Sequence, residues 1–383
     1  MENKSDLLRA AATFLPRNAS YFMKNQFKTM KAVKRLDDNI YLLDYQNEYF
    51  LDELLESGVA NTAQLISFAA KKLTFGEKLF SIGKMDGGCS TFEAHTPEGC
   101  HTLGRNFDFK NAPCFVLWTH PKNGYKSVAV VDCNFMLYGT YVNKAMPKLN
   151  AIQSLLAPDC CVDGINEKGL AIAVLQIRAK ATNQTDPSKK DITTTSMIRA
   201  VLDKCASVDE AVEFIKAHNM HDDLWTRYHY QIIDKEKSVV VEYVGDELHV
   251  VDNASEIYAD DGIDEQYVTN YYIVKDNGDS SAENHGQDRA AEIIKTLQEN
   301  KGVLTELDSM DLLSKVKLNY KHPKYPWKVI ALWSSVYNAD NATLKLAANL
   351  RYDRVYTFSA TEPYRILARD GLENTYDIGW DYL

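Results

Sequence analysis

The sequence of 383 residues predicts an α+β fold, in which antiparallel sheets are layered with helices. The first observation is a series of short strand patterns joined by tight turns, which is typical of hairpins. The second is that paired helical patterns interrupt these hairpins. The third is the composition, because 45% hydrophobic and 25% charged residues are ordinary for a globular chain with a large core.

The first part of the chain has helical patterns. Residues 47–55 place apolar side chains on one face, Gly58 is expected to end that helix, and residues 62–73 resume the pattern. The segment Met85-Asp86-Gly87-Gly88 then predicts a flexible hinge. We expect strands at residues 89–95, 101–109, 170–177, 228–233, 238–244, 247–251, 329–337, 343–350 and 354–359. Further helices are expected at residues 194–206, from 207 to about 218, at 287–300 and at 308–316.

The net charge of −10 hides an uneven distribution along the chain. Residues 1–35 contain eight Lys or Arg and two Asp or Glu, a net charge of +6. Such a segment is typical of a transit-like peptide, of a helix on a membrane surface, or of a basic segment lying on its own acidic domain, and we favour the last. The overall acidity argues against a nucleic-acid partner, because such proteins need a basic surface.

The seven cysteines are spread along the chain in an odd number, with no CxxC pair and no secretory signal before them. This pattern favours free thiols in a reducing compartment, and we therefore expect a cytoplasmic protein. The sequence contains no metal or nucleotide motif, so no cofactor is expected. His218, His221, Asp222 and Asp223 lie at helical spacing near an expected helix end, where we interpret them as a solvated terminus.

Cys89 is the strongest candidate for a catalytic residue. It follows Gly87 and Gly88 and opens the first expected strand, and glycines permit a close approach of the backbone. A thiol there can attack the carbonyl of Gly88, and hydrolysis after this N-to-S acyl shift frees Cys89 as a new N-terminus. The α-amino group, with a pKa of roughly 7.7–8.0, is then suited to take the proton of a thiol with a pKa of ~8.5.

Two charged residues on the next strand are expected near this thiol. If the turn is centred on residues 97 and 98, Cys89 lies opposite Asn106, between Arg105 and Asp108. Arg105 would favour the thiolate and Asp108 would anchor the new ammonium. Residues three apart point to opposite faces of a strand, so both face the thiol only with a bulge at residues 106–107. On spacing alone, a structural cysteine beside a surface Arg–Asp pair remains the alternative.

Several motifs resemble the choloylglycine hydrolase family of linear amide C–N hydrolases, which includes bile salt hydrolases, penicillin V acylases, acid ceramidase and N-acylethanolamine amidase. The intervals of 16 and 19 residues from Cys89 to Arg105 and Asp108 match the family pattern. The resemblance implies an N-terminal-nucleophile (Ntn) hydrolase with an αββα four-layer sandwich. The similar motifs are Cys89–Phe92, Gly104–Phe109, Asp163–Ala171, Ser238–Glu242, Val268–Asn270 and Trp333–Tyr337.

The resemblance also implies further site residues. Asn270 is similar to the residue that donates to the tetrahedral oxyanion, and Gln176 stands where bile salt hydrolases have a second Asn. Arg289 resembles the remaining site arginine. The alternatives are that Gln176 is a satisfied polar residue of a strand and that Arg289 is a solvated helix residue. Residues 1–88 resemble the helical pro-segment of the acid ceramidase branch, which leaves residues 89–383 as the catalytic domain.

The implied activity is hydrolysis of linear amide bonds in N-acyl compounds of fatty acyl amide, conjugated bile acid or penicillin V type, after autocleavage between Gly88 and Cys89. The expected partner is this small-molecule amide, with no cofactor and no metal. We also expect a homo-oligomer, and the basic N-terminus leaves contact with a membrane open. The alternatives are an acyltransferase of the isopenicillin N acyltransferase type and an unprocessed, non-catalytic binding protein of the same fold.

Overall fold

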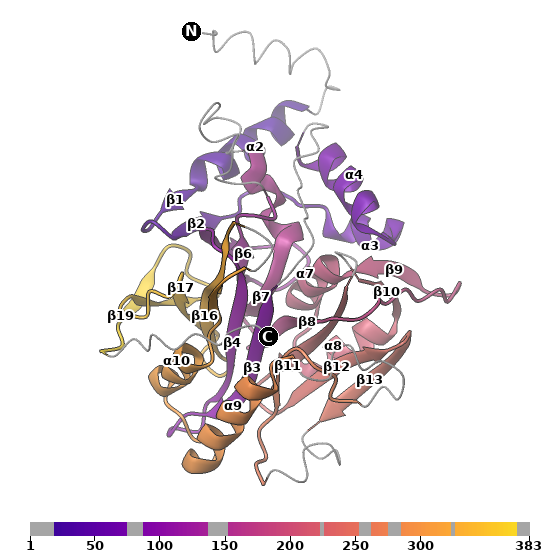
Figure 1. The fold of residues 1–383 in the computed structure, drawn as a ribbon. Helices are drawn as coiled ribbons and strands as arrows, with labels where there is room; N and C mark the ends of the chain where they lie inside the picture. The colour runs from indigo at the N-terminus through magenta and orange to yellow at the C-terminus, as the bar shows by residue number, and fades with distance from the viewer. Residues whose placement is uncertain are drawn as a thin grey trace.

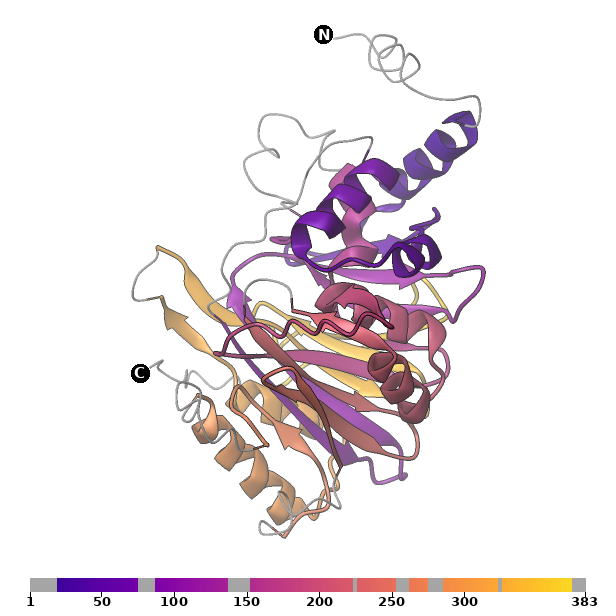
Figure 2. The same cartoon turned by 90° about the vertical axis from the view of Figure 1, so that its right-hand side faces the viewer.

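The computed structural model describes residues 19–74, 87–136, 152–222, 226–252, 262–274, 285–322 and 326–373. In these residues two large sheets pack against each other, and helices cover the outer face of each sheet (Figure 1, Figure 2). The predicted α+β class and the αββα sandwich are therefore confirmed. Residues 1–18 and the Met85–Asp86 part of the predicted hinge lie outside the described residues.

The first sheet has nine strands, and its neighbours are antiparallel except for β2 and β5. In order across the sheet the strands are β1 (Lys34–Arg35), β2 (Ile40–Asp44), β5 (Cys114–Thr119), β6 (Ser127–Asp132), β7 (Cys161–Asn166), β8 (Ala171–Ile177), β11 (Arg227–Ile233), β12 (Ser238–Val244) and β13 (Glu247–Asp252). Strands β5 to β8 are buried along their whole length, because the second sheet covers one face and helices the other.

The second sheet has eight strands and contains the predicted hairpin that carries Cys89. Seven strands follow one another across the sheet, and the short β15 (Asn319–Lys321) also pairs with β16. Their order is β14 (Tyr267–Val268), β3 (Gly88–His95), β4 (His101–Lys110), β16 (Lys328–Asn338), β17 (Thr343–Ala348), β18 (Val355–Ser359) and β19 (Ile366–Asp370).

The outer helices agree with the predicted ones to within a few residues. α7 (Thr194–Lys204) and α8 (Val208–Lys216) pack on the nine-stranded sheet. α9 (Gln287–Asn300) and α10 (Glu306–Lys315) pack on the eight-stranded sheet. The starts of α8 and α10 are fixed by caps, because the hydroxyls of Ser207 and Thr305 accept hydrogen bonds from the first turn.

Residues 19–74 are not wholly helical, which corrects the expectation for this part of the chain. The helices α2 (Ala19–Ala32), α3 (Leu51–Ser57) and α4 (Thr62–Lys72) lie together at one end of the sandwich (Figure 1). Between them, β2 pairs in parallel with β5 inside the nine-stranded sheet, and its Ile40, Leu42 and Leu43 are buried. A buried strand of five residues has too little periodicity to be distinguished from a helix by pattern alone.

The ion pairs between residues 19–74 and the rest of the described chain do not follow the predicted charge complementarity. Asp52 pairs with Lys204 at 2.6 Å, Asp44 with His120 at 2.6 Å, and Glu56 with Lys190 at 3.8 Å. In each pair the leading segment supplies the acid and the remainder supplies the base. Within the described part of the basic segment, Lys34 contacts the rest of the chain through its charge, since its Nζ lies 3.7 Å from the ring centre of Tyr364.

The interpretation of residues 218–223 as a solvated terminus is wrong for the residues that the structure describes. Residues His218–His221 form strand β10, which pairs in parallel with β9 (Lys190–Thr193). His221 is buried and lies 2.9 Å from Asp191, while burial raises the pKa of Asp222 to about 7. Asp223 lies outside the described residues. None of the described helices is both long and apolar enough to span a membrane.

Two tyrosines after β2 fasten the leading segment to the rest of the molecule. The Tyr45 hydroxyl donates to the carbonyl of Leu155 at 2.8 Å. The Tyr49 hydroxyl donates to Asp203 at 2.5 Å, and Asp203 forms a buried ion pair with Arg199 at 2.6 Å. Because all these groups are buried, loss of one partner leaves a desolvated polar atom without a hydrogen bond.

We expect Tyr49→Phe to lower the free energy of unfolding by about 1–3 kcal/mol, because the Asp203 carboxylate loses a buried hydrogen bond. Urea denaturation monitored by circular dichroism measures the change. Tyr125→Phe is the control, because that partly exposed hydroxyl has no hydrogen bond to another described residue. Equal effects of the two substitutions would contradict the role of Tyr49.

Candidate active site

The hairpin of β3 and β4 determines what surrounds Cys89. His95 pairs with His101, which leaves residues 96–100 in the turn and places Cys89 opposite Phe107. The predicted partner, Asn106, is opposite Ser90 instead. The prediction was wrong by one residue because it centred the turn between residues 97 and 98. A shift of one residue moves every side chain of the partner strand to the other face.

Arg105 and Asp108 approach Cys89 from opposite faces of the sheet. The pairing of β3 with β4 is continuous from Gly88 to His95, so the predicted bulge at residues 106–107 is absent from it. Arg105 shares the inner face with Cys89, toward the nine-stranded sheet, where it meets Asp163 of β7. Asp108 is opposite Gly88 and faces α9 and α10. There it lies near the guanidinium of Arg289 and accepts a hydrogen bond from the amide of Leu318.

The two glycines before Cys89 allow the chain to pass closely over its neighbours. A Cβ atom on Gly87 would lie 2.2 Å from the carbonyl oxygen of Asp108. A Cβ atom on Gly88 would lie 2.5 Å from the side chain of Leu318 and 3.4 Å from both Arg289 and Asn270. A side chain at either position would therefore push the Gly88–Cys89 peptide away from the polar groups around it.

Arg105 is held in place by a buried carboxylate between the two sheets. Its Nε donates to Asp163 Oδ2 at 3.0 Å. Asp163 also accepts hydrogen bonds from the indole of Trp333 at 2.9 Å and the hydroxyl of Tyr337 at 2.7 Å. All four side chains are fully buried, so every polar atom of Asp163 needs these partners.

The charge of Arg105 is close to the thiol of Cys89. Burial alone would lower the pKa of the guanidinium, but the neighbouring Cys89 and Asp163 raise it above its usual value. Arg105 also lies 5.1 Å from the ring centre of Phe107, the residue opposite Cys89. The structure thus places a fixed positive charge beside the thiol of Cys89 on the inner face of the sheet.

Two side chains hold the main chain of Cys89. The amide nitrogen of Cys89 donates to Asn270 Oδ1 at 2.7 Å, and its carbonyl oxygen accepts a hydrogen bond from Arg289 Nη1. Arg289 Nη1 also donates to the hydroxyl of Ser90 at 2.7 Å, and Nη2 donates to Asn270 Oδ1 at 2.7 Å. Arg289 is 1% exposed, so it is not the solvated helix residue considered as an alternative.

Gln176 meets this network through its backbone. Its carbonyl oxygen accepts a hydrogen bond from Asn270 Nδ2 at 2.7 Å, whereas its side-chain amide donates to the hydroxyl of Thr226 at 3.2 Å. The amide nitrogens of Asn270 and Gln176 therefore both have acceptors within the described residues. A role for either group as an oxyanion donor requires it to exchange that acceptor for the substrate.

Asp108 is a buried carboxyl with an unusual proton affinity. Desolvation raises its pKa from 3.8 to about 6, although Arg289, the amide of Leu318 and Arg105 lower it. The Leu318 amide donates to Oδ1 at 3.1 Å. Oδ2 accepts no hydrogen bond from a described residue, and the nearest cation is Arg289 Nη1 at 3.8 Å. This oxygen can accept a further donor beside the Gly88–Cys89 peptide.

Sequence reasoning missed the residues that support Arg105 and Arg289. Asp163, Trp333 and Tyr337 lie inside two of the motifs that carry the family resemblance, but their residue types gave no indication of a shared partner. Ser90 was part of the first motif and had no assigned role. The available signal was an acid within one motif and two aromatic hydrogen-bond donors within another motif far along the chain.

The description "linear amide C–N hydrolases, choloylglycine hydrolase family" belongs to the family model that matches residues 89–291, more than half of the chain. The chain belongs to this family. The predicted enzyme class, a hydrolase of linear amide C–N bonds with the Ntn-hydrolase fold, is thereby confirmed. The matched range begins at Cys89 and includes Arg105, Asp108, Asp163, Gln176, Asn270 and Arg289.

A solved hydrolase structure shares this fold. A mutant of the conjugated bile acid hydrolase from Clostridium perfringens has a TM-score of 0.51 and 15% identity, and the match covers 76% of this chain and 99% of that chain. The penicillin V acylase from Agrobacterium tumefaciens has a TM-score of 0.48 and 17% identity, with 72% and 87% covered. At 15% identity, the first likeness shows a shared fold alone.

We expect Asp163→Asn to lower the free energy of unfolding by about 3–5 kcal/mol, because it leaves the buried Arg105 without a carboxylate. It should also slow alkylation of Cys89, since Arg105 loses its fixed position. Urea denaturation and peptide mapping after iodoacetamide labelling measure the two effects. The control is Asp353→Asn, which removes the exposed pair with Arg351 and should leave stability nearly unchanged. Similar effects of both substitutions would contradict the role of Asp163.

The raised pKa of Asp108 predicts a pH-dependent contribution to stability. Because the folded chain binds this proton more tightly than the unfolded chain, ionisation of Asp108 makes the free energy of unfolding fall as pH rises from about 4 through about 6. In the Cys89→Ala background, which keeps the Gly88–Cys89 peptide intact, Asp108→Asn should therefore gain stability relative to Asp108 between pH 4 and pH 7.5, by roughly 3 kcal/mol at most. Urea denaturation at both pH values measures this difference. Asp353→Asn should show no such gain, because Arg351 lowers the pKa of that carboxyl.

Proposed function

We propose that this family member is a cysteine Ntn amidase that becomes active when the chain is cut between Gly88 and Cys89. The observation that carries the proposal is the set of contacts around Cys89. Arg105 lies beside its thiol, Asn270 holds its amide nitrogen, and Arg289 holds its carbonyl oxygen. A structural cysteine needs none of these contacts, whereas a nucleophile requires a fixed main chain and a nearby positive charge.

The proposed cleavage is an N-to-S acyl shift followed by hydrolysis. The Cys89 sulfur bonds to the carbonyl carbon of Gly88, the bond from that carbon to the Cys89 nitrogen breaks, and the nitrogen takes the thiol proton. Water then hydrolyses the thioester, which frees the thiol and leaves Gly88 with a carboxylate. The hydrogen bond from the Cys89 amide to Asn270 supports this route, because it orients the leaving nitrogen.

The new α-amino group would have a ready partner in Asp108. The carboxylate lies opposite Gly88 in the hairpin, and its Oδ2 accepts no hydrogen bond from the described residues. An ammonium at Cys89 would fill that vacancy and favour the ionised form of Asp108. In its neutral form the same amine can take the thiol proton and later return it to the leaving nitrogen of a substrate.

Asn270 and Gln176 are the proposed oxyanion donors. Each side-chain amide already donates within the site, to the Gln176 carbonyl and to Thr226 respectively. Substrate binding would have to replace those acceptors with the oxyanion, which carries more charge and forms the stronger hydrogen bond. Arg289 is proposed to fix the orientation of Asn270, because its Nη2 donates to Oδ1 and leaves Nδ2 as the donor.

The substrate is proposed to be a linear N-acyl amide with an apolar acyl group, of the fatty acyl, conjugated bile acid or penicillin V type. The names of the similar structures support the amide class, since they include a bile acid hydrolase and a penicillin acylase.

We further propose that residues 1–88 stay associated with residues 89–383 after cleavage, which is supported by the pairing of β2 with β5.

Cytoplasmic localisation and a homo-oligomeric state remain predictions. The first is supported by the cysteines, since all seven are free thiols.

We expect intact-mass spectrometry of the purified wild-type protein to show two fragments that end at Gly88 and begin at Cys89. Cys89→Ala should remain a single chain, because it lacks the attacking sulfur. Cys205→Ala is the matched control, since it removes another buried cysteine away from the site and should cleave like wild type. An uncleaved wild type would contradict the processing step.

The same samples test the amidase activity. A panel of N-acyl amides with fatty acyl, bile acid and phenoxyacetyl groups should yield free amine with cleaved wild type and Cys205→Ala, and none with Cys89→Ala. Amide hydrolysis that persists in Cys89→Ala would exclude Cys89 as the nucleophile. Cleaved protein that hydrolyses none of the panel would contradict the proposed substrate class.

A further inference from the structure

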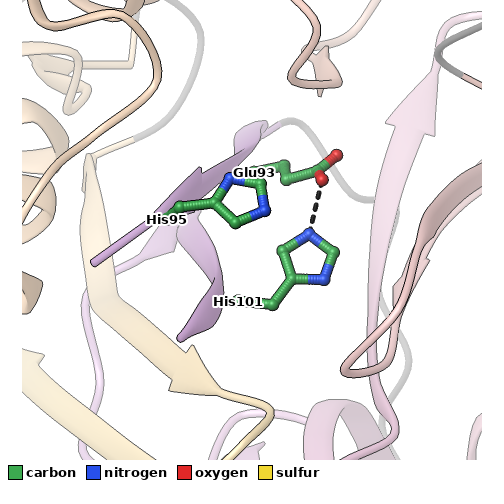
Figure 3. A group of neighbouring side chains, drawn as sticks. All are labelled: Glu93, His95 and His101. Carbon is green, nitrogen blue, oxygen red and sulfur yellow. Dashed lines mark hydrogen bonds and ion pairs between the residues drawn. The ribbon is translucent and has the colours of Figure 1, made fainter. Parts of the chain in front are cut away.

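A group of metal-ligating side chains lies at the turn end of the β3–β4 hairpin. Glu93 and His95 come from β3, and His101 is the first residue of β4. One ligand atom from each lies within 4.8 Å of the other two. Figure 3 shows the carboxylate of Glu93 meeting one nitrogen of the His101 imidazole, with the imidazole of His95 alongside. These residues are not part of the site around Cys89.

A second carboxylate, Glu265, lies beside His95 in the segment before β14. Glu265 Oε1 lies 3.9 Å from His95 Nδ1. Its carboxylate packs over Gly302, where a Cβ atom would lie 1.5 Å from Oε1, and the positive φ of +69° at that residue also favours glycine. The chain after α9 thus leaves room for this carboxylate beside the histidines.

The inner ligands are already oriented by the backbone around them. His101 Nδ1 lies 2.6 Å from the carbonyl oxygen of Asp234, which fixes Nδ1 as the donor and turns Nε2 toward Glu93. The second oxygen of Glu93 accepts a hydrogen bond from the amide of Gln266 at 3.1 Å. Metal-binding histidines and carboxylates typically have such outer hydrogen bonds, which fix the tautomer and the direction of the ligand atom.

The group contains two carboxylates, whose negative charge favours the binding of a cation. Glu93 and Glu265 bring two carboxylates together, and among the described residues their ion-pair partners are histidines rather than lysines or arginines. Both Glu93 and His101 are nearly inaccessible to solvent, whereas the side chain of His95 is 43% exposed. The ring of His95 stacks on that of His101 with 4.8 Å between ring centres, so an ion that enters past the exposed His95 reaches the two buried side chains.

We propose that Glu93, His95, His101 and Glu265 bind a divalent transition-metal ion of the zinc class. Two imidazoles and two carboxylates form a ligand set that zinc commonly accepts. Around a tetrahedral ion the ligand atoms stand ~3.4 Å apart. The contact between Glu93 and His101 would therefore have to open, while His95 and Glu265, at 3.9 Å from each other, would have to move closer to that pair. Rotation of the half-exposed His95 off the His101 ring, together with rotation of the Glu265 carboxylate, would supply these movements.

The ion would join three parts of the fold that meet at this end of the hairpin. These are β3 with β4, the segment before β14, and the chain after α9, whose Gly302 and Leu304 exchange backbone hydrogen bonds with His95. Glu265 lies only five residues before Asn270, so the ion would fasten the segment that carries Asn270 to β3. The proposed role is therefore structural, and it does not depend on the proposed amidase function.

The test uses the full chain, kept reduced and freed of metal by chelation. Isothermal titration calorimetry with zinc chloride should give one site per chain, and zinc should raise the unfolding temperature. His95→Ala and Glu265→Gln should each weaken zinc binding at least tenfold and abolish the rise in unfolding temperature. The cobalt-substituted protein should show weak visible bands without the intense near-ultraviolet band of a cobalt–thiolate bond.

The matched control is His249→Ala. His249 also lies 3.9 Å from a glutamate, Glu247, and its side chain is also partly exposed, but it belongs to no group of three ligating side chains within the described residues. This variant should bind zinc like wild type. His95 is exposed enough that its loss should leave the unfolding temperature of the metal-free protein unchanged, which separates binding from misfolding. Absence of a one-site isotherm in wild type, equal binding by His95→Ala, or a cobalt–thiolate band would overturn the proposal.

Discussion

The ion pair between Arg105 and Asp163 is the interaction on which the arrangement of the site depends. It crosses from β4 to β7 and so joins the two sheets at their buried interface. Because neither charge reaches water, the pair is stable only while Trp333 and Tyr337 of β16 complete the hydrogen bonds of the carboxylate. The spacing of the sheets, the register of β4 with β16 and the position of the cation beside Cys89 are thereby fixed together.

The polar contacts of Cys89 come from both sides of its sheet. The thiol side faces the nine-stranded sheet and Arg105, while the main chain is held by Arg289, which extends from α9 on the outer layer. A helix on one side and a buried ion pair on the other thus define the position of one residue. The two preceding glycines make this possible, since any side chain there would collide with Asp108 or Leu318.

Most strands and outer helices were predictable because each has several residues with a clear period. The strand β2 was not, since five buried residues show no alternation, and neither were β5 and β6, whose continuous apolar runs carry the same ambiguity. The register of the Cys89 hairpin was missed by one residue because turn length, rather than strand pattern, sets it. The aromatic partners of Asp163, Trp333 and Tyr337, lie about 170 residues away along the chain, and tertiary packing alone brings them to it.

The parallel pairing of β2 with β5 gives the proposed cut a kinetic consequence. While the chain is continuous, β2 finds β5 as part of the same molecule, and that encounter does not depend on protein concentration. Once the peptide bond before Cys89 is broken, reassembly of the nine-stranded sheet would require two separate chains to meet, so refolding would become second order. Folding would therefore have to precede cutting, and the mature protein would hold its shape through the slowness of strand separation rather than through easy renaturation.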